Sequence, residues 1–392
     1  MRKSSNPSVA ELTEHPREIE SGVRPRVTLT SVAIATVACL GLNMVLVAIG
    51  MRPPRRDEDE FFLAKREMVD QAASATDDPV QWLVLGDSSA AFGFDPVRFN
   101  ERTRQRAVNA ATFGSLGLWG DVWMLERFIA AGGGNDPPPT VVMIHAADVW
   151  TGGYEGGFYQ YAAGIDEPDG PSFRRILAGR PGGQDLRIWA LHRGWLPITQ
   201  LKTMLRRSTP PSKPAPLHRD GRRLLSIDRA NPSSVESAVA AWRDRSDESA
   251  NLDDRHVRAL QRIIGITRRH SMPLIIANGP IAEPVTRTAS FQKRVGVIEH
   301  RVREIARQHP HVHYLDRWIA FPPEVMENEN HVVAPAAIRY TDRLIGHLQT
   351  ADRLNLPVVN LPDVNLPEVT LFKQDFSSVA SPSDPNDSVG GN

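Results

Sequence analysis

The chain has 392 residues, of which 41% are hydrophobic and 23% are charged, proportions that are typical of globular proteins. This length fits two average domains or one α/β domain with insertions. The 46 basic and 46 acidic residues leave no net charge that would attract nucleic acid, so no nucleic-acid partner is expected. Because Cys39 is the single cysteine, the sequence excludes an intrachain disulfide framework and a cysteine-based metal site.

The first predicted element is a membrane-spanning helix at residues 27 to 51. This stretch contains no charged residue, and about 20 apolar residues suffice to cross a bilayer. A secretory signal would have a shorter apolar core and a small-x-small cleavage site, so we favour an uncleaved anchor; a buried core helix is the alternative. Arginines flank the stretch on both sides, so the positive-inside rule favours the two possible membrane orientations almost equally. We place the main domain outside the cytosol because the chemistry indicated by the later motifs suits an envelope substrate.

The rest of the chain divides by composition. The polar residues 1 to 26 are predicted to be a cytosolic tail, and residues 52 to 78 a linker. The folded domain is expected at residues 79 to 350, with an insertion at residues 152 to 249 that has glycine and proline clusters and no clear period. Three Asn-Leu-Pro steps, five residues apart, begin the tail at residues 351 to 392, which is predicted to be extended or disordered.

Short apolar runs alternate with helical patterns along the expected domain. The run at residues 81 to 85, which ends at Gly86, is typical of a buried strand that meets a turn. Strands that alternate with helices indicate a parallel sheet covered on both faces, so we expect an α/β fold, a three-layer α/β/α sandwich of the flavodoxin-like kind. In chain order we predict a helix at 60 to 73, a strand at 81 to 85, a helix at 116 to 131, a strand at 140 to 144, a helix at 253 to 270, a strand at 273 to 277, a helix at 291 to 308, a strand at 312 to 315 and a helix at 334 to 350.

The first candidate for chemistry is Gly86-Asp87-Ser88-Ser89, directly after the first predicted strand. Ligands of open parallel sheets bind beyond the carboxyl ends of the strands. Gly86 allows a tight turn and Asp87 can brace it through backbone hydrogen bonds. Ser88 would then project from the start of a helix as a candidate nucleophile. An ordinary turn is the alternative, because these residue types are common in turns.

The second candidate is Asn328-Glu329-Asn330-His331, just before the last predicted helix. A serine hydroxyl is a poor nucleophile until a base takes its proton, and histidine has a suitable pKa for this role. His331 is therefore the candidate base. The other histidines that we considered lie in polar helical or loop contexts, where a solvated surface role is expected.

A strand, a Gly-Asp-Ser turn and a late histidine before the final helix resemble the SGNH or GDSL hydrolase superfamily. In that family the serine is the nucleophile, and an aspartate and a histidine of the last block complete a triad. The resemblance places these roles on Ser88, Asn328 and His331. The family's second block supplies a glycine after an asparagine, which here corresponds to Gly114 after Asn109. It implies that the backbone N–H groups of Ser88 and Gly114 are the oxyanion donors; a plain loop glycine is the alternative for Gly114.

Two positions depart from the family's pattern. Where the third block has an asparagine that donates to the oxyanion, this chain has Ala147, and removal of one such donor can lower the rate about 100- to 1000-fold. Asn328 replaces the triad aspartate and cannot stabilise an imidazolium electrostatically, although it can orient a histidine. Glu327 or Glu329 could take its place, and a serine–histidine dyad oriented by a main-chain carbonyl is a further option.

The resemblance is to membrane-anchored, envelope-modifying members, similar to the proteins of teichoic acid D-alanylation and alginate O-acetylation. It implies a serine esterase or O-acyltransferase that acts on an envelope polysaccharide or lipid-linked glycan through an acyl-serine intermediate. The expected partners are the membrane, this carbohydrate and, for transfer, an acyl-donating membrane protein. No cofactor is expected, and no metal site, because His145 and Asp148 have no evident third ligand. The alternative, motivated by Ala147 and Asn328, is a catalytically degenerate domain that binds glycan or protein.

Overall fold

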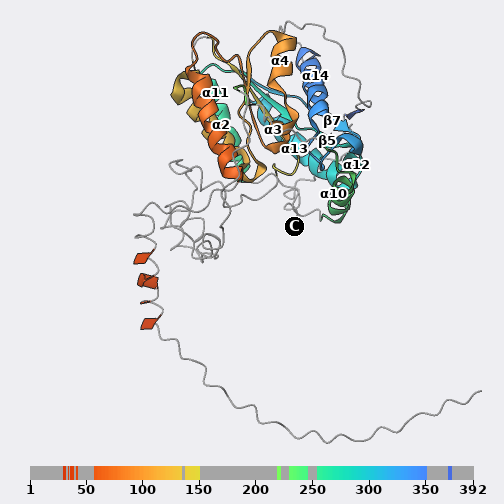
Figure 1. The fold of residues 1–392 in the computed structure, drawn as a ribbon. Helices are drawn as coiled ribbons and strands as arrows, with labels where there is room; N and C mark the ends of the chain where they lie inside the picture. Colours follow the sequence, from red (N-terminus) through yellow and green to blue (C-terminus); the bar gives the residue numbers. More distant parts are fainter. Residues whose placement is uncertain are drawn as a thin grey trace, which may run out of the picture. The chain divides into compact units, whose positions relative to one another are not determined.

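The computed structural model describes residues 57 to 134, 137 to 150, 219 to 221, 229 to 245, 254 to 350 and 370 to 372, with scattered residues between 30 and 42 (Figure 1). The chain divides into two units, Met1–Arg52 and Pro53–Asn392. Most of the predicted membrane span lies outside the described residues. Among the helices of the described part, none combines the length and the apolar character that crossing a membrane requires.

The larger unit is built on a parallel sheet, as the alternating sequence pattern predicted, but with five strands, of which β2 was not predicted. The strand order is β2-β1-β3-β4-β6, so successive strands are added in opposite directions from β1. A ligand crevice is expected where the order reverses, at the carboxyl ends of β1 and β3. The strands are β1 (Trp82–Gly86), β2 (Ala107–Asn109), β3 (Thr140–His145), β4 (Leu274–Asn278) and β6 (Val312–Tyr314).

Helices cover both faces of this sheet. Alternate strand residues point to opposite faces, and accordingly Leu83 and Leu85 belong to one hydrophobic core whereas Trp82 and Val84 belong to the other. In Figure 1, α2 and α11 lie on one side of the sheet and α14 lies on the other. The helices are α2 (Asp57–Ser74), α3 (Ser88–Gly93), α4 (Pro96–Thr103), α5 (Gly117–Phe128), α10 (Pro232–Asp244), α11 (Asp254–Arg269), α12 (Glu283–Thr286), α13 (Ala289–Arg307) and α14 (Ala334–Thr350), with short helical turns η1 (Gly114–Leu116), η2 (Ile129–Gly133) and η4 (Pro323–Val325).

A second, smaller sheet leads the chain toward His331, and the sequence did not predict it. It contains β5 (Ile281–Ala282), β7 (Trp318–Phe321) and β8 (Thr370–Phe372) in the order β5-β7-β8. β5 and β7 are parallel, and β8 is antiparallel to β7. The predicted tail thus contributes one strand, while its other residues lie outside the described part.

The expected insertion at residues 152 to 249 contributes α10 to the core, although no helical period was recognised there. The side chains of Val235, Val239 and Trp242 are buried in the same core as α14. Trp242 packs edge-on against Phe291 of α13, with ring centroids 5.2 Å apart. Residues 152 to 218 of the expected insertion lie outside the described residues.

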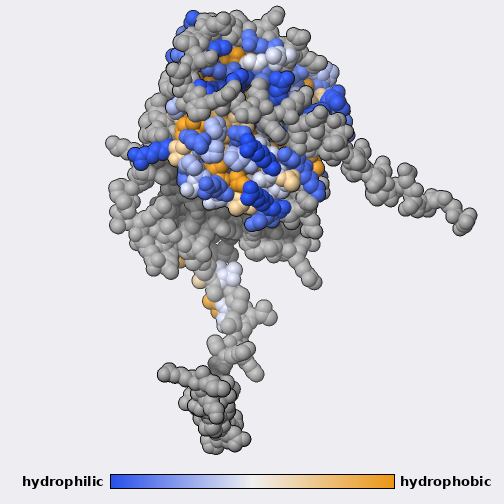
Figure 2. Space-filling view, turned by 90° about the vertical axis from the view of Figure 1, so that its right-hand side faces the viewer, coloured by the Kyte–Doolittle hydropathy of each residue, from blue (hydrophilic) through white to orange (hydrophobic). Residues whose placement is uncertain are grey.

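On the surface, polar side chains separate the apolar ones. Figure 2 shows hydrophilic and hydrophobic described residues intermixed on one face. Within the described part of residues 57 to 372, Val297 is the one large hydrophobic side chain that is exposed, whereas Ile34, Val37 and Leu42 of the N-terminal unit are all exposed. The apolar residues of the larger unit are thus concentrated in its two cores.

The packed unit begins with α2 rather than at residue 79. The predicted helix at residues 60 to 73 extends over Asp57–Ser74, and its Phe62 and Val69 are buried in the core of the α5 face. Lys65 is also buried, and its ammonium group donates to the backbone carbonyls of Asn109 at 2.5 Å and Gly221 at 2.7 Å. A buried charge needs such partners, so α2 is fixed to the end of β2 instead of serving as a linker.

This packing predicts the effect of trimming α2. Replacement of Phe62 by alanine removes a side chain that is only 2% exposed and should lower the free energy of unfolding by about 3–5 kcal/mol. Glu67→Ala, at an exposed position of the same helix, should change it by less than about 0.5 kcal/mol. Denaturant unfolding of the full chain measures both values, and equal effects would contradict a packed α2.

Candidate active site

The sequence Gly86-Asp87-Ser88 forms a sharp turn from β1 into α3. Gly86 has φ +147°, and a Cβ there would overlap the carbonyl oxygen of Ile144 on β3, so this position requires glycine. Ser88 is the first residue of α3 and is partly exposed. Gly279, just after β4, packs so closely that a Cβ would overlap the Ser89 hydroxyl. The turn is therefore held between the ends of three neighbouring strands.

The Asp87 carboxylate braces this turn from inside the protein. Its Oδ1 accepts hydrogen bonds from the Ser89 backbone N–H at 2.8 Å and the Ser89 hydroxyl at 2.5 Å. Its Oδ2 accepts from the Ala146 backbone N–H at 2.8 Å. One side chain thus caps α3 and ties it to the end of β3, as predicted for Asp87.

His331 reaches Ser88 from a loop 243 residues further along the chain. Its Nε2 lies 2.8 Å from the Ser88 Oγ, which is hydrogen-bonding distance. The loop follows β7 and η4 and is closed by a hydrogen bond from the Glu327 backbone N–H to the His331 carbonyl at 2.9 Å. The Phe92 ring lies beside the imidazole, with centroids 4.9 Å apart. The structure thus brings the predicted nucleophile and base together.

Two side chains contact the other ring nitrogen of His331. Asn328 Nδ2 lies 2.9 Å from Nδ1, and Glu327 Oε2 lies 3.1 Å from it. The Asn328 Oδ1 accepts from the backbone N–H groups of Asn330 at 3.0 Å and His331 at 2.9 Å. Glu329, the other carboxylate considered from the sequence, contributes its backbone carbonyl to the Ala282 N–H at 2.8 Å.

Asn109 and Gly114 lie behind and beside the nucleophile turn. The Asn109 side chain is buried and donates to the carbonyls of Ala90 and Phe94, both at 3.0 Å, so it supports the helix that carries Ser88. Gly114 begins η1, and a Cβ at this position would lie 4.0 Å from the Asp87 Cβ. Gly114 is thus close to the turn.

The departure at Ala147 leaves an apolar side chain at the end of β3. Ala147 is 2% exposed and belongs to a hydrophobic core. The next residue, Asp148, has its pKa raised to about 6 because burial penalises the carboxylate and the charges of Asp87 and Glu329 add to the effect, while Arg245 opposes it. Asp148 is therefore expected to titrate near pH 6.

A buried histidine lies between two carboxylates beneath the turn. His145 Nε2 is 2.6 Å from Asp121 Oδ2, and its Nδ1 is 3.7 Å from Asp87 Oδ2. All three side chains are at most 3% exposed. The sequence interpretation considered His145 only as a metal ligand and did not select Asp121. The one signal for Asp121 was its position among apolar residues in the first half of the stretch GLWGDVWMLERF.

These contacts keep His145 charged. Burial alone would lower its pKa, but the charge and hydrogen bond of Asp121, assisted by Asp87, outweigh burial and raise the pKa to about 10. Burial raises the Asp87 pKa, but the charge of His145, whose Nδ1 lies 3.7 Å away, together with the hydrogen bonds from Ser89 and Ala146, lowers it overall. The Asp87 carboxylate therefore remains ionised in the position that holds the turn.

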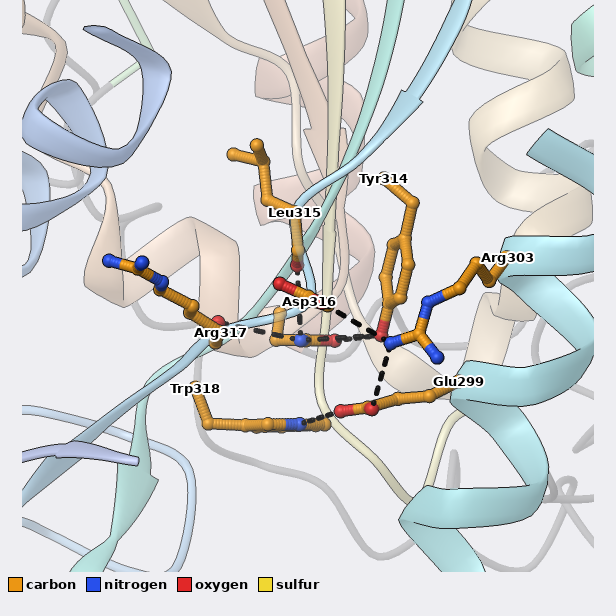
Figure 3. Close-up of polar contacts among 8 residues, drawn as sticks. Glu299, Arg303, Tyr314, Leu315, Asp316, Arg317 and Trp318 are labelled. Carbon is orange, nitrogen blue, oxygen red and sulfur yellow. Dashed lines mark hydrogen bonds and ion pairs between the residues drawn. The ribbon is translucent and has the colours of Figure 1, made fainter. Parts of the chain in front are cut away.

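A polar network fixes the segment that leads from β6 to the His331 loop (Figure 3). Glu299 on α13 is buried, and it accepts from the Trp318 indole N–H at 3.0 Å and pairs with Arg303 at 3.6 Å. Arg303 also contacts Asp316 at 3.3 Å. At the end of β4, the Asn278 amide donates to the carbonyls of residues 315 and 317 at 3.4 Å and 3.5 Å. These contacts attach β7, which precedes the His331 loop, to α13 and β4.

Comparison with protein-family models and with curated proteins finds no match for the chain.

The charged His145 predicts a loss of stability in alkali. The unfolded chain releases this proton near pH 6.5, whereas the folded protein retains it to about pH 10. The stabilising contribution is fully present below about pH 6.5 and should fall by up to about 1.4 kcal/mol per pH unit until His145 titrates in the folded protein.

Denaturant unfolding of the full chain at pH 6 to 10 measures this slope. The matched variant Asp121→Asn removes the closest charge from His145, so its slope between these pH values should be smaller than that of the wild type. Equal slopes would show that the Asp121–His145 pair does not couple folding to protonation.

Proposed function

We propose that this chain is a membrane-anchored serine esterase or O-acyltransferase that acts on an envelope polysaccharide or lipid-linked glycan. The observation that carries the proposal is the 2.8 Å contact between Ser88 Oγ and His331 Nε2. A base at this distance can take the serine proton as the oxygen attacks a carbonyl carbon. The site also lies where the strand order reverses, the usual ligand position in such sheets.

The proposed reaction has two balanced halves. Ser88 Oγ attacks the ester carbon while its proton moves to His331 Nε2, and the tetrahedral oxyanion is held by the backbone N–H groups of Ser88 and Gly114. The intermediate collapses to an acyl-Ser88, and the leaving alkoxide takes the proton from His331. Water, or a sugar hydroxyl in a transferase, then gives its proton to His331 and attacks the acyl carbon. The second tetrahedral intermediate breaks its bond to Ser88 Oγ and releases the free acid or the new sugar ester, while His331 returns the proton to Ser88 Oγ.

The SGNH resemblance supports this assignment of the reaction class. The chain resembles that family in its Gly-Asp-Ser turn after the first strand of a parallel sheet and its histidine before the last helix. The two residues that the resemblance pairs, Ser88 and His331, are in contact. The proposed anchor is supported by the uncharged stretch at residues 27 to 51, because about 20 apolar residues suffice to cross a bilayer.

The second candidate is a degenerate SGNH-like domain that binds glycan or a partner protein. It is favoured by the amide of Asn328 against His331 Nδ1 at 2.9 Å and by the apolar Ala147. In this case Ser88 and His331 would be retained as binding groups without turnover.

Labelling with a fluorophosphonate, which reacts with activated serines, separates the two candidates. The full chain is used because α2 belongs to the core. The adduct is expected on Ser88 by peptide mass mapping, absent in Ser88→Ala and formed at least about 100-fold more slowly in His331→Ala. Ser237→Ala, which removes an exposed serine of α10, should label like the wild type. A folded protein without an adduct on Ser88 would favour the binding domain.

A further inference from the structure

The contacts of His331 Nδ1 conflict with each other. The Glu327 carboxylate can only accept a hydrogen bond, so its contact at 3.1 Å requires a proton on Nδ1. The Asn328 Nδ2 can only donate, so its contact at 2.9 Å requires that Nδ1 carry no proton. A neutral imidazole has one N–H, so the two neighbours favour opposite tautomers.

The orientation of the Asn328 amide is fixed by its other bonds. Its Oδ1 accepts from the backbone N–H groups of Asn330 at 3.0 Å and His331 at 2.9 Å. A flipped amide would direct its N–H groups at these two donors and lose both bonds. The amide nitrogen therefore faces the imidazole, and Asn328 favours the tautomer that lacks a proton on Nδ1.

Only one tautomer can activate Ser88. With the proton on Nδ1, Nε2 has a free lone pair and accepts the Ser88 proton at 2.8 Å. With the proton on Nε2, the ring donates to Ser88 Oγ and cannot act as its base. The imidazolium that forms during the reaction carries both protons, so the Glu327 carboxylate stabilises it and the Asn328 amide opposes it.

We propose that Glu327 is the acid that positions His331, and that Asn328 restrains the site by stabilising the unproductive tautomer. This inference rests on the proposed serine chemistry and deepens it. In the family pattern the acid stands at the position of Asn328, whereas here it is displaced to the preceding residue. The Glu327 side chain is 42% exposed, so it can leave Nδ1, and the balance between the two neighbours then sets how active Ser88 is.

The test compares fluorophosphonate labelling rates of Ser88 in full-length variants. Asn328→Asp keeps the oxygen that accepts the two backbone bonds and replaces the opposing amide donor by an acceptor. Labelling of Ser88 should become at least about 10-fold faster. The direction follows from serine protease triads, in which asparagine in place of aspartate lowers the rate about 10,000-fold. Glu327→Ala should label about 100-fold more slowly, and Asn328→Asp should restore the rate in the double variant. Glu329→Gln, a neighbouring carboxylate, should stay within about two-fold of wild type.

Histidine ¹⁵N chemical shifts provide a readout that a structural defect would not produce. The His331 signals, assigned by their loss in His331→Ala, should show protonated Nδ1 in Asn328→Asp and protonated Nε2 in Glu327→Ala. Where the wild type labels, an unchanged labelling rate in Glu327→Ala overturns the inference, as does slower labelling in folded Asn328→Asp.

The outcomes also separate this inference from the proposed function. Wild-type labelling that depends on His331 but not on Glu327 retains the function and overturns the inference. If Ser88 is labelled in Asn328→Asp but not in the wild type, the inference is supported, and Asn328 keeps Ser88 of the natural chain inactive. If Asn328→Asp fails to fold, the labelling rate of Ser88 in Glu327→Ala and the tautomer of His331 in the wild type still test the inference.

Discussion

The arrangement around Ser88 depends on the Asp87 carboxylate. This one group accepts from the Ser89 N–H and hydroxyl and from the Ala146 N–H, and so joins the turn after β1 to the end of β3. A buried carboxylate is costly unless its charge is compensated, and His145 supplies that compensation from beneath the turn. The buried charge of His145 thus has a geometric consequence: it keeps the Asp87 carboxylate ionised, and the ionised carboxylate fixes the turn that carries Ser88.

The second half of the site is assembled from a different sheet, and its position depends on different contacts. His331 lies on a loop after β7, and the Glu299–Trp318 and Asn278 hydrogen bonds fasten that region to α13 and β4. The Ser88–His331 contact therefore joins two independently braced segments. In the proposed reaction, a nucleophile and a base held in this way need little rearrangement before proton transfer, which favours general base catalysis.

Local pattern was sufficient for the main frame and for selecting Ser88 and His331, the two residues that the fold brings into contact. The runs that became β1, β3 and β4 are mainly apolar before polar or glycine ends, and their alternation with α5, α11 and α13 predicted the parallel sheet. β2 has three residues and α10 lies among glycine- and proline-rich segments, so neither gave a clear periodic signal. Asp121 and Glu327 were harder, because their roles come from contacts with His145 and His331 in the folded chain. Residue type and spacing did not select Asp121, and they left Glu327 beside Glu329 as one of two carboxylates that could replace the triad aspartate.

The central claim is that Ser88 is a nucleophile that carries an acyl group, and trapping that group tests it most directly. The full chain would be mixed with p-nitrophenyl acetate, quenched in acid during the first turnover, and digested for mass mapping. The account predicts an initial burst of nitrophenol and one acetyl group on Ser88, both absent in Ser88→Ala. A burst that persists in Ser88→Ala, or acetyl groups that accumulate only on other residues, would contradict it.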